Sequence, residues 1–311
     1  MVESSSGASG SSRVLMFVGG GEDPQLRRLA EAAHARGFEI SPMITLDEGP
    51  RGVLWSLDSE GASQMTDERG EPLRAHAAFL RQDVFKFLRT NHDMDNVDAR
   101  AWRVLMEAWL AANPQVRRFN RGFFLKDSAN KPYALVQAQR AGLQVPRTRL
   151  TALAAELRAW AAQEEVVYKP IDGGDHCRVL TVENLEIYGE GVLPRPYIFQ
   201  ERLVAPEIRI FRVGPKFFAF RVESPSLDYR EHQDATLVPI EPPAELLPGL
   251  TRVSDELGLN FCAADFKTRA SDGALCFMEI NSNPMFAGFD MACEGALCGG
   301  MLDVLMGEEP L

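Results

Sequence analysis

The sequence lacks the features that mark zinc domains, disulfide scaffolds and membrane spans. Its five cysteines in 311 residues include no CxxC pair and no Cys/His cluster with zinc-ligand spacing, so we expect reduced thiols. No apolar run is long enough to cross a bilayer. Basic residues are in the minority, with 33 Lys and Arg against 44 Asp and Glu, and the resulting net charge of −11 disfavours a nucleic-acid partner.

Targeting and dinucleotide signals are missing as well. Residues 1–12 are rich in Ser and Gly and carry neither a basic nor an apolar segment, so we expect them to form a disordered leader. Residues 19–21 are three glycines that follow an apolar run, but the GxGxxG fingerprint is absent. We therefore expect a cytoplasmic protein that has no membrane partner.

The patterns that are present predict two domains, in keeping with the length of 311 residues. In residues 13–126, a buried-type strand is followed by helical periodicity, which predicts an α/β domain. Residues 127–311 are richer in strands and predict an α+β domain. A linker is expected near Pro146, a hairpin over residues 261–281, and a last helix over residues 290–306.

The most specific chemical signal lies on the predicted hairpin. Asp265 is on its first strand, and Glu279 and Asn281 are two residues apart on the second, so they project from one face. Oxygen donors of this kind suit Mg²⁺ that also holds nucleotide phosphates. Carboxylates among apolar strand residues are costly unless they are paired or bind a cation. The alternative is that one of them pairs with a lysine such as Lys267.

Two further segments are suited to other parts of a nucleotide. Lys169 ends a strand and precedes Gly173 and Gly174, an arrangement that is typical of phosphate sites, and Lys131 could add a second cation. A lone lysine is nevertheless more often a solvated surface residue. The segment 199–203 could offer main-chain groups to an adenine edge, and Glu207 could accept hydrogen bonds from ribose hydroxyls.

Taken in this order, these segments resemble the ATP-grasp superfamily over residues 128–290, more than half of the chain. The resemblance implies an ATP-grasp domain of two α+β subdomains that clamp ATP, preceded by a pre-ATP-grasp α/β domain. The roles it implies are phosphate binding by Lys131, Lys169, Gly173 and Gly174, adenine binding by Gln200, Glu201 and Leu203, ribose binding by Glu207, and Mg²⁺ binding by Asp265, Glu279 and Asn281.

Within the superfamily, two stretches are similar to the glutamate-ligase and glutathione-synthetase-like branch. They are residues 129–148 and residues 279–286, whose Glu-x-Asn pattern runs on into a proline. The segment 226–230, with Asp228, a tyrosine and Arg230, also resembles the Asp-aromatic-Arg segment of microviridin-type peptide cyclases. Those enzymes form ester or amide crosslinks within a ribosomal precursor peptide.

The resemblance implies that the γ-phosphate of ATP activates a carboxylate as an acyl phosphate, which a nucleophile then attacks. Arg209 and Arg230 are candidates for holding the carboxylate or the acyl phosphate, although each could instead pair with a neighbouring acid. We expect peptide crosslinking or amino-acid addition. The alternatives are a ligase for free amino acids or small peptides, and a nucleotide- or peptide-binding module without turnover. A homodimer is the default expectation.

Overall fold

The computed structural model describes residues 13–41, 44–45, 53–57, 59, 63–67, 69–81, 93–121, 131–171, 177–186, 191–224 and 235–311. The chain divides into two compact units, one of Met1–Phe119 with Cys298–Leu311 and one of Asn120–Leu297. Among the described residues, no helix combines the length and the apolar character that a bilayer span requires.

The first unit contains the parallel sheet expected of an α/β domain. Strand β1 (Val14–Gly19) is buried and pairs in parallel with β2 (Glu39–Ile40) and β3 (Ile44–Thr45) on one side and with β6 (Ala77–Leu80) on the other. The N-terminus of helix α1 (Pro24–Ala35) is stabilised because Asp23 accepts a hydrogen bond from the Gln25 amide and a proline occupies the first turn. The unit also contains α3 (Asp93–Ala112) and the hairpin of β4 (Leu54–Leu57) and β5 (Ser63–Thr66).

The C-terminus belongs to this first unit, whereas the sequence assigned it to the second domain. Arg117 donates from Nη2 to the Val304 and Glu309 carbonyl oxygens at 2.8 and 2.9 Å, and Arg36 pairs with Asp303 at 2.8 Å. Cations at the end of α10 (Ala296–Met306) satisfy its last carbonyls and complement the helix dipole. These partners are far apart in sequence, which is why a local pattern did not reveal them.

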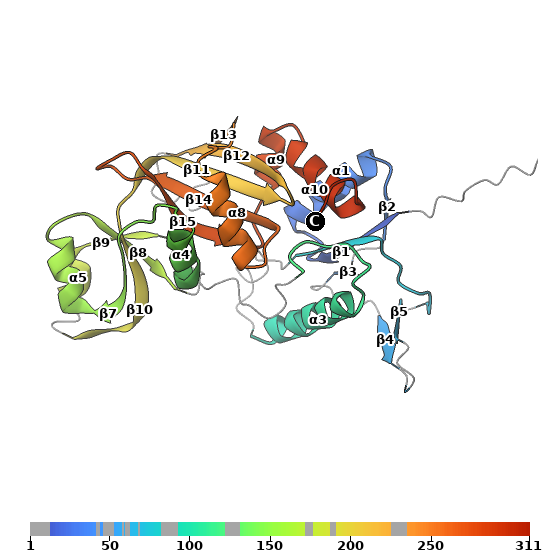
Figure 1. Cartoon of the computed structure of the whole chain (residues 1–311). Helices are drawn as coiled ribbons and strands as arrows, with labels where there is room; N and C mark the ends of the chain where they lie inside the picture. Colours follow the sequence, from blue (N-terminus) through green and yellow to red (C-terminus); the bar gives the residue numbers. More distant parts are fainter. Residues whose placement is uncertain are drawn as a thin grey trace, which may run out of the picture. The chain divides into compact units, whose positions relative to one another are not determined.

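The second unit contains two antiparallel sheets (Figure 1). The four-stranded sheet has the order β7-β10-β8-β9, and the five-stranded sheet has the order β13-β12-β11-β14-β15. The strands of the first are β7 (Thr148–Leu153), β8 (Val166–Pro170), β9 (Arg178–Leu180) and β10 (Val192–Glu201). Those of the second are β11 (Val204–Val213), β12 (Lys216–Glu223), β13 (Thr236–Ile240), β14 (Phe261–Thr268) and β15 (Leu275–Asn281). The segment near Pro146, expected to be a linker, leads directly into β7.

One face of each sheet is covered by helices. Helices α5 (Ala154–Ala161) and α6 (Val182–Glu186) belong to the four-stranded sheet, whose core packs around Trp160 and Phe199. Helices α4 (Lys131–Arg140) and α8 (Leu247–Glu256) lie along the five-stranded sheet (Figure 1) and share a core with Cys262, Ala264 and Phe266 of β14. Because side chains alternate along a strand, this packing turns Ala263 and Asp265 toward the opposite face.

The last predicted helix is two helices in the structure. Helix α9 (Ala287–Ala292) ends before Glu294 and Gly295, which have φ values of 55° and 89°, and α10 starts after them. Left-handed backbone cannot continue a right-handed helix. The apolar periodicity of the two helices runs across this break, so the pattern indicated one long helix.

Candidate functional site

The predicted metal set comes together on the hairpin of β14 and β15. Asp265 and Glu279 are directly paired across the two strands, and a register irregularity follows Asp265. Asn281 donates from Nδ2 to Glu279 Oε1 at 3.3 Å. Asp265 and Glu279 are buried, with 6% and 7% of each residue exposed, so their charges need partners. The set offers two carboxylates and one amide within one patch.

Both predicted lysines reach this patch. Lys131, at the start of α4, and Lys169, on β8, each place Nζ 3.7 Å from Glu279 Oε2. Lys169 also donates to the Met278 carbonyl oxygen at 3.5 Å. Lys169 comes from the four-stranded sheet and Glu279 from the five-stranded sheet, so this ion pair joins the two sheets.

Arg209 is held inside the site by Asp265. Its Nε and Nη2 atoms donate to Asp265 Oδ1 and Oδ2 at 2.6 and 2.7 Å, a bidentate pair between residues that are 5% and 6% exposed. The guanidinium also lies 5.2 Å from the centre of the Phe289 ring. The alternative of an ordinary surface pair does not describe this buried contact, and substrate binding by Arg209 stays a prediction.

Glu207 and Lys267 form the next row of the same sheet face. Their side chains pair at 3.2 Å, so Lys267 binds Glu207 and Arg209 binds Asp265, whereas the sequence alternative joined Lys267 to the predicted metal set. Burial, and next the charge of Asp265, raise the pKa of Glu207, while Lys267 acts to lower it. A carboxyl group with a raised pKa beside a lysine is suited to hydrogen bonding with hydroxyl groups.

The end of β10 is tightly bound. Gln200 donates from Nε2 to Thr148 Oγ1 at 3.1 Å, and Leu203 is buried just beyond the strand. Glu201 accepts hydrogen bonds from Arg147 and Arg269. Burial alone would raise the pKa of Glu201, but the Arg147 amide and the two guanidinium groups outweigh it and lower the pKa. The predicted hinge is therefore anchored through the Glu201 side chain.

An apolar strip beside Lys169 was missed by the sequence analysis. Ile198 of β10 pairs with Leu150 on one side and with Lys169 on the other, so the three side chains share a face. Val167 and Val179 extend that face, because Val167 pairs with both Gln200 and Val179. Only strand alternation could have revealed this strip. Its arrangement suits a flat apolar ring at one end and phosphate groups at the lysine.

Some predicted residues fall outside the described part of the chain. Gly173 and Gly174 of the glycine loop lie there, and so do Arg230 and the Asp228 segment that carries it. Their roles stay predictions from the sequence.

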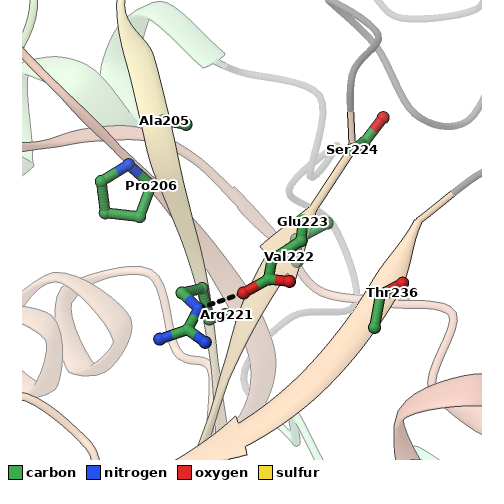
Figure 2. Close-up of a pocket in the computed structure, with 7 residues that line it drawn as sticks. All are labelled: Ala205, Pro206, Arg221, Val222, Glu223, Ser224 and Thr236. Atoms are coloured by element: carbon green, nitrogen blue, oxygen red, sulfur yellow. Dashed lines mark hydrogen bonds and ion pairs between the residues drawn. The ribbon is translucent and has the colours of Figure 1, made fainter.

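The pocket in Figure 2 lies at the margin of the five-stranded sheet, where β11 and β13 begin and β12 ends. Its volume is about 600 Å³. Its lining residues are Ala205, Pro206, Arg221, Val222, Glu223, Ser224 and Thr236. Arg221 and Glu223 form an exposed ion pair there. None of the predicted site residues lines it, so the buried charges rather than this hollow define the candidate site.

The donor set fits a hard cation. Its oxygens are the kind that Mg²⁺ prefers, and few are needed because water and phosphate complete the coordination. Asp265 is already bound by Arg209, but a carboxylate has lone pairs beyond the two that a guanidinium engages. Among the described residues, three His, Cys, Asp or Glu side chains do not gather in a metal-binding group. Two acids and Asn281 form a sparse donor set, which suits a metal whose remaining positions are filled by water and phosphate oxygens.

Comparison with known proteins supports the fold. No protein-family model and no curated protein matches the chain. The ATP-grasp ligase PsnB, in a structure with a phosphomimetic variant of its minimal precursor, Mg and ADP, is 26% identical with a TM-score of 0.76, over 96% of this chain and 99% of that one.

Two more distant structures share the architecture. A Chryseobacterium gregarium RiPP-associated ATP-grasp ligase, in complex with ADP and a leader and core peptide, is 17% identical with a TM-score of 0.75, over 96% of this chain and 98% of its own. The macrocyclase MdnC from Microcystis aeruginosa MRC, bound with precursor peptide MdnA, is 20% identical with a TM-score of 0.71, over 94% of this chain and 99% of its own. Together with the likeness to PsnB, these likenesses span both units, so the chain has the fold of the ATP-grasp ligases.

Proposed function

We propose that the protein is an ATP- and Mg²⁺-dependent ligase that activates a carboxylate of a peptide and joins it to a hydroxyl or amine. The observation that carries this proposal is the meeting of Lys131 and Lys169 with Glu279, next to Asp265 and Asn281. A metal-bound triphosphate requires cations beside its phosphates and oxygen donors beside its metal, and this arrangement offers both.

The chain's own residues support each part of this chemistry. Lys131 and Lys169 would neutralise the charge that grows on the transferred phosphoryl group. Asp265, Glu279 and Asn281 would hold Mg²⁺, which supplies a fixed positive charge to the phosphate oxygens. The strip of Leu150, Ile198 and Val167 would receive the adenine ring. Positioning of this kind supplies most of the acceleration in phosphoryl transfer.

The reaction has two balanced steps. A carboxylate oxygen of the substrate attacks the γ-phosphorus and ADP leaves, which gives an acyl phosphate. A hydroxyl or amine then attacks the acyl carbon, phosphate leaves, and the nucleophile loses its proton. Arg209 is a candidate for contacting the acyl phosphate because its guanidinium is already fixed in the site by Asp265 and Phe289.

A peptide substrate is favoured over a free amino acid by the comparisons. PsnB, the Chryseobacterium gregarium ligase and MdnC are each described with a precursor or with leader and core peptides. The likeness extends over 98–99% of each of those chains. We propose that the protein is cytoplasmic, because its cysteines are odd in number and include no CxxC pair. A homodimer stays a prediction from the sequence.

The test is phosphate release with mass spectrometry of the product. The protein is incubated with ATP, Mg²⁺ and synthetic peptides that contain Thr, Ser, Lys, Asp and Glu, and in parallel with free glutamate. We expect peptide-dependent phosphate release and loss of one water for each bond formed. Glu279→Gln should abolish both, and the matched control Glu223→Gln should keep both. Nucleotide binding without phosphate release for any carboxylate would favour a non-catalytic binding module.

A further inference from the structure

The Glu201 carboxylate is bound from two separate parts of the second unit. Arg147 donates to it from its backbone amide at 2.8 Å and from Nε and Nη2 at 3.0 and 2.9 Å. Arg269 donates to the same carboxylate from Nε at 3.1 Å. Glu201 is 5% exposed, whereas the side chains of Arg147 and Arg269 are 64% and 17% exposed, so a buried acid is bound by one exposed and one largely buried guanidinium group. These three residues are hereafter the Glu201 cluster.

The Glu201 cluster joins the two sheets at the predicted hinge. Glu201 is the last residue of β10 in the four-stranded sheet, and Arg147 directly precedes β7 of the same sheet. Arg269 follows β14 in the five-stranded sheet and donates from Nη2 to the Val145 carbonyl oxygen at 2.8 Å. Asp272 holds the Arg269 Nη1 atom at 3.0 Å. Arg269 is therefore fixed on one sheet while it binds the end of the other.

The cluster fixes backbone as well as side chains. The Glu201 amide donates to the Arg147 carbonyl oxygen at 3.1 Å, and the Arg202 amide donates to the Glu165 carbonyl oxygen at 3.0 Å. A strand end needs only its ladder bonds, whereas this one carries an additional buried carboxylate that costs stability unless its donors stay in place. The cost is explained if the direction of the backbone from Glu201 to Leu203 matters for binding.

We propose that Arg147 and Arg269 are positioning residues that act through Glu201 to fix the Glu201–Arg202–Leu203 backbone for reading the edge of the nucleotide base. This inference rests on the proposed function. Neither arginine touches the nucleotide or the reacting atoms; each sets the orientation of peptide groups that do. The cluster therefore controls recognition of the base, while Lys131 and Lys169 control binding of the phosphates.

This separation of roles is testable with two probes. Dissociation constants are measured by calorimetry for ADP with Mg²⁺ and for inorganic triphosphate with Mg²⁺, which lacks a base. Arg269→Gln removes the charged donor from Glu201, and Arg269→Lys retains the charge but not the fork. Arg221→Gln is the matched control, because it breaks an exposed Arg–Glu pair of the same unit. Lys169→Met serves as the opposite case.

Arg269→Gln should weaken ADP binding about tenfold and leave triphosphate binding within about twofold, as expected for the loss of a charge-assisted hydrogen bond that orients only the backbone facing the base. Arg269→Lys should restore part of the ADP affinity. Lys169→Met should weaken both probes, and Arg221→Gln neither.

Equal weakening of both probes by Arg269→Gln, or weakening of neither, would overturn the proposal. If Arg269→Gln does not fold, Arg269→Lys decides, because unchanged ADP affinity relative to triphosphate in that variant would also overturn it. Failure of the wild-type protein to bind either probe would instead contradict the proposed function.

Discussion

The pair of Arg209 and Asp265 should couple strongly in a double-mutant cycle. Arg209→Met removes both donors of a bidentate pair whose residues are 5% and 6% exposed, and it leaves the Asp265 carboxylate buried. Removing one partner of a buried pair costs about 3–5 kcal/mol, because the remaining charge loses its compensation. Replacing both partners, as in Arg209→Met with Asp265→Leu, should cost far less than the sum of the single changes.

The assay is hydrogen exchange of peptides from β11 and β14, which reports on the second unit separately from the first. The exposed pair of Arg221 and Glu223, whose side chains are 45% and 50% exposed, is the control and should give a coupling of about 0.2–1 kcal/mol. If the single changes at Arg209 and Asp265 are additive, or if their coupling energy is smaller than that of the control pair, the assignment of a buried, compensated pair is refuted.

Three further experiments have clear expected outcomes. Lys267→Met should raise the already raised pKa of Glu207 further, because it removes the cation that lowers this pKa. The folded state then holds the Glu207 proton more tightly than the unfolded state, so stability should fall as pH rises from the ordinary Glu value of 4.5 through the raised pKa; a free energy of unfolding in urea that stays constant over that window would contradict this. Burial raises the pKa of the Cys262 thiol to about 12, so iodoacetamide at pH 8 should leave it unmodified in the native protein, as peptide mass spectrometry would show. Gly19→Ala should destabilise the first unit by about 1–3 kcal/mol in urea unfolding, because its Cβ would lie 2.5 Å from Leu26 Cδ1 and 2.8 Å from the Arg81 carbonyl oxygen.

The parts of the fold that were predicted are those with strong local patterns. Strand β1 and the hairpin of β14 and β15 could be predicted because their apolar runs are local patterns that do not depend on residues far away in the sequence. The break between α9 and α10 was missed because it depends on two residues with positive φ rather than on polarity. The place of the C-terminus depends on long-range hydrogen bonds from Arg117, which a local pattern cannot show.

The site was predictable where ligand chemistry limits the residue type. Asp265, Glu279 and Asn281 stand out because carboxylates and an amide on apolar strands need a reason to be there. The partners of each charge were not predictable, because cross-strand register decides that Glu207 lies opposite Lys267 and that Arg209 lies opposite Asp265. The apolar strip around Ile198 was missed for the same reason, because the sequence does not show which apolar residues of neighbouring strands share a face of the sheet.

A crystal structure of the protein with a non-hydrolysable ATP analogue and Mn²⁺ tests the central claim most directly. Anomalous scattering should place Mn²⁺ at coordination distance from Glu279 and Asn281, with the phosphates between that metal and the Nζ atoms of Lys131 and Lys169. A metal bound away from Glu279, or phosphates that contact neither lysine, would contradict the account.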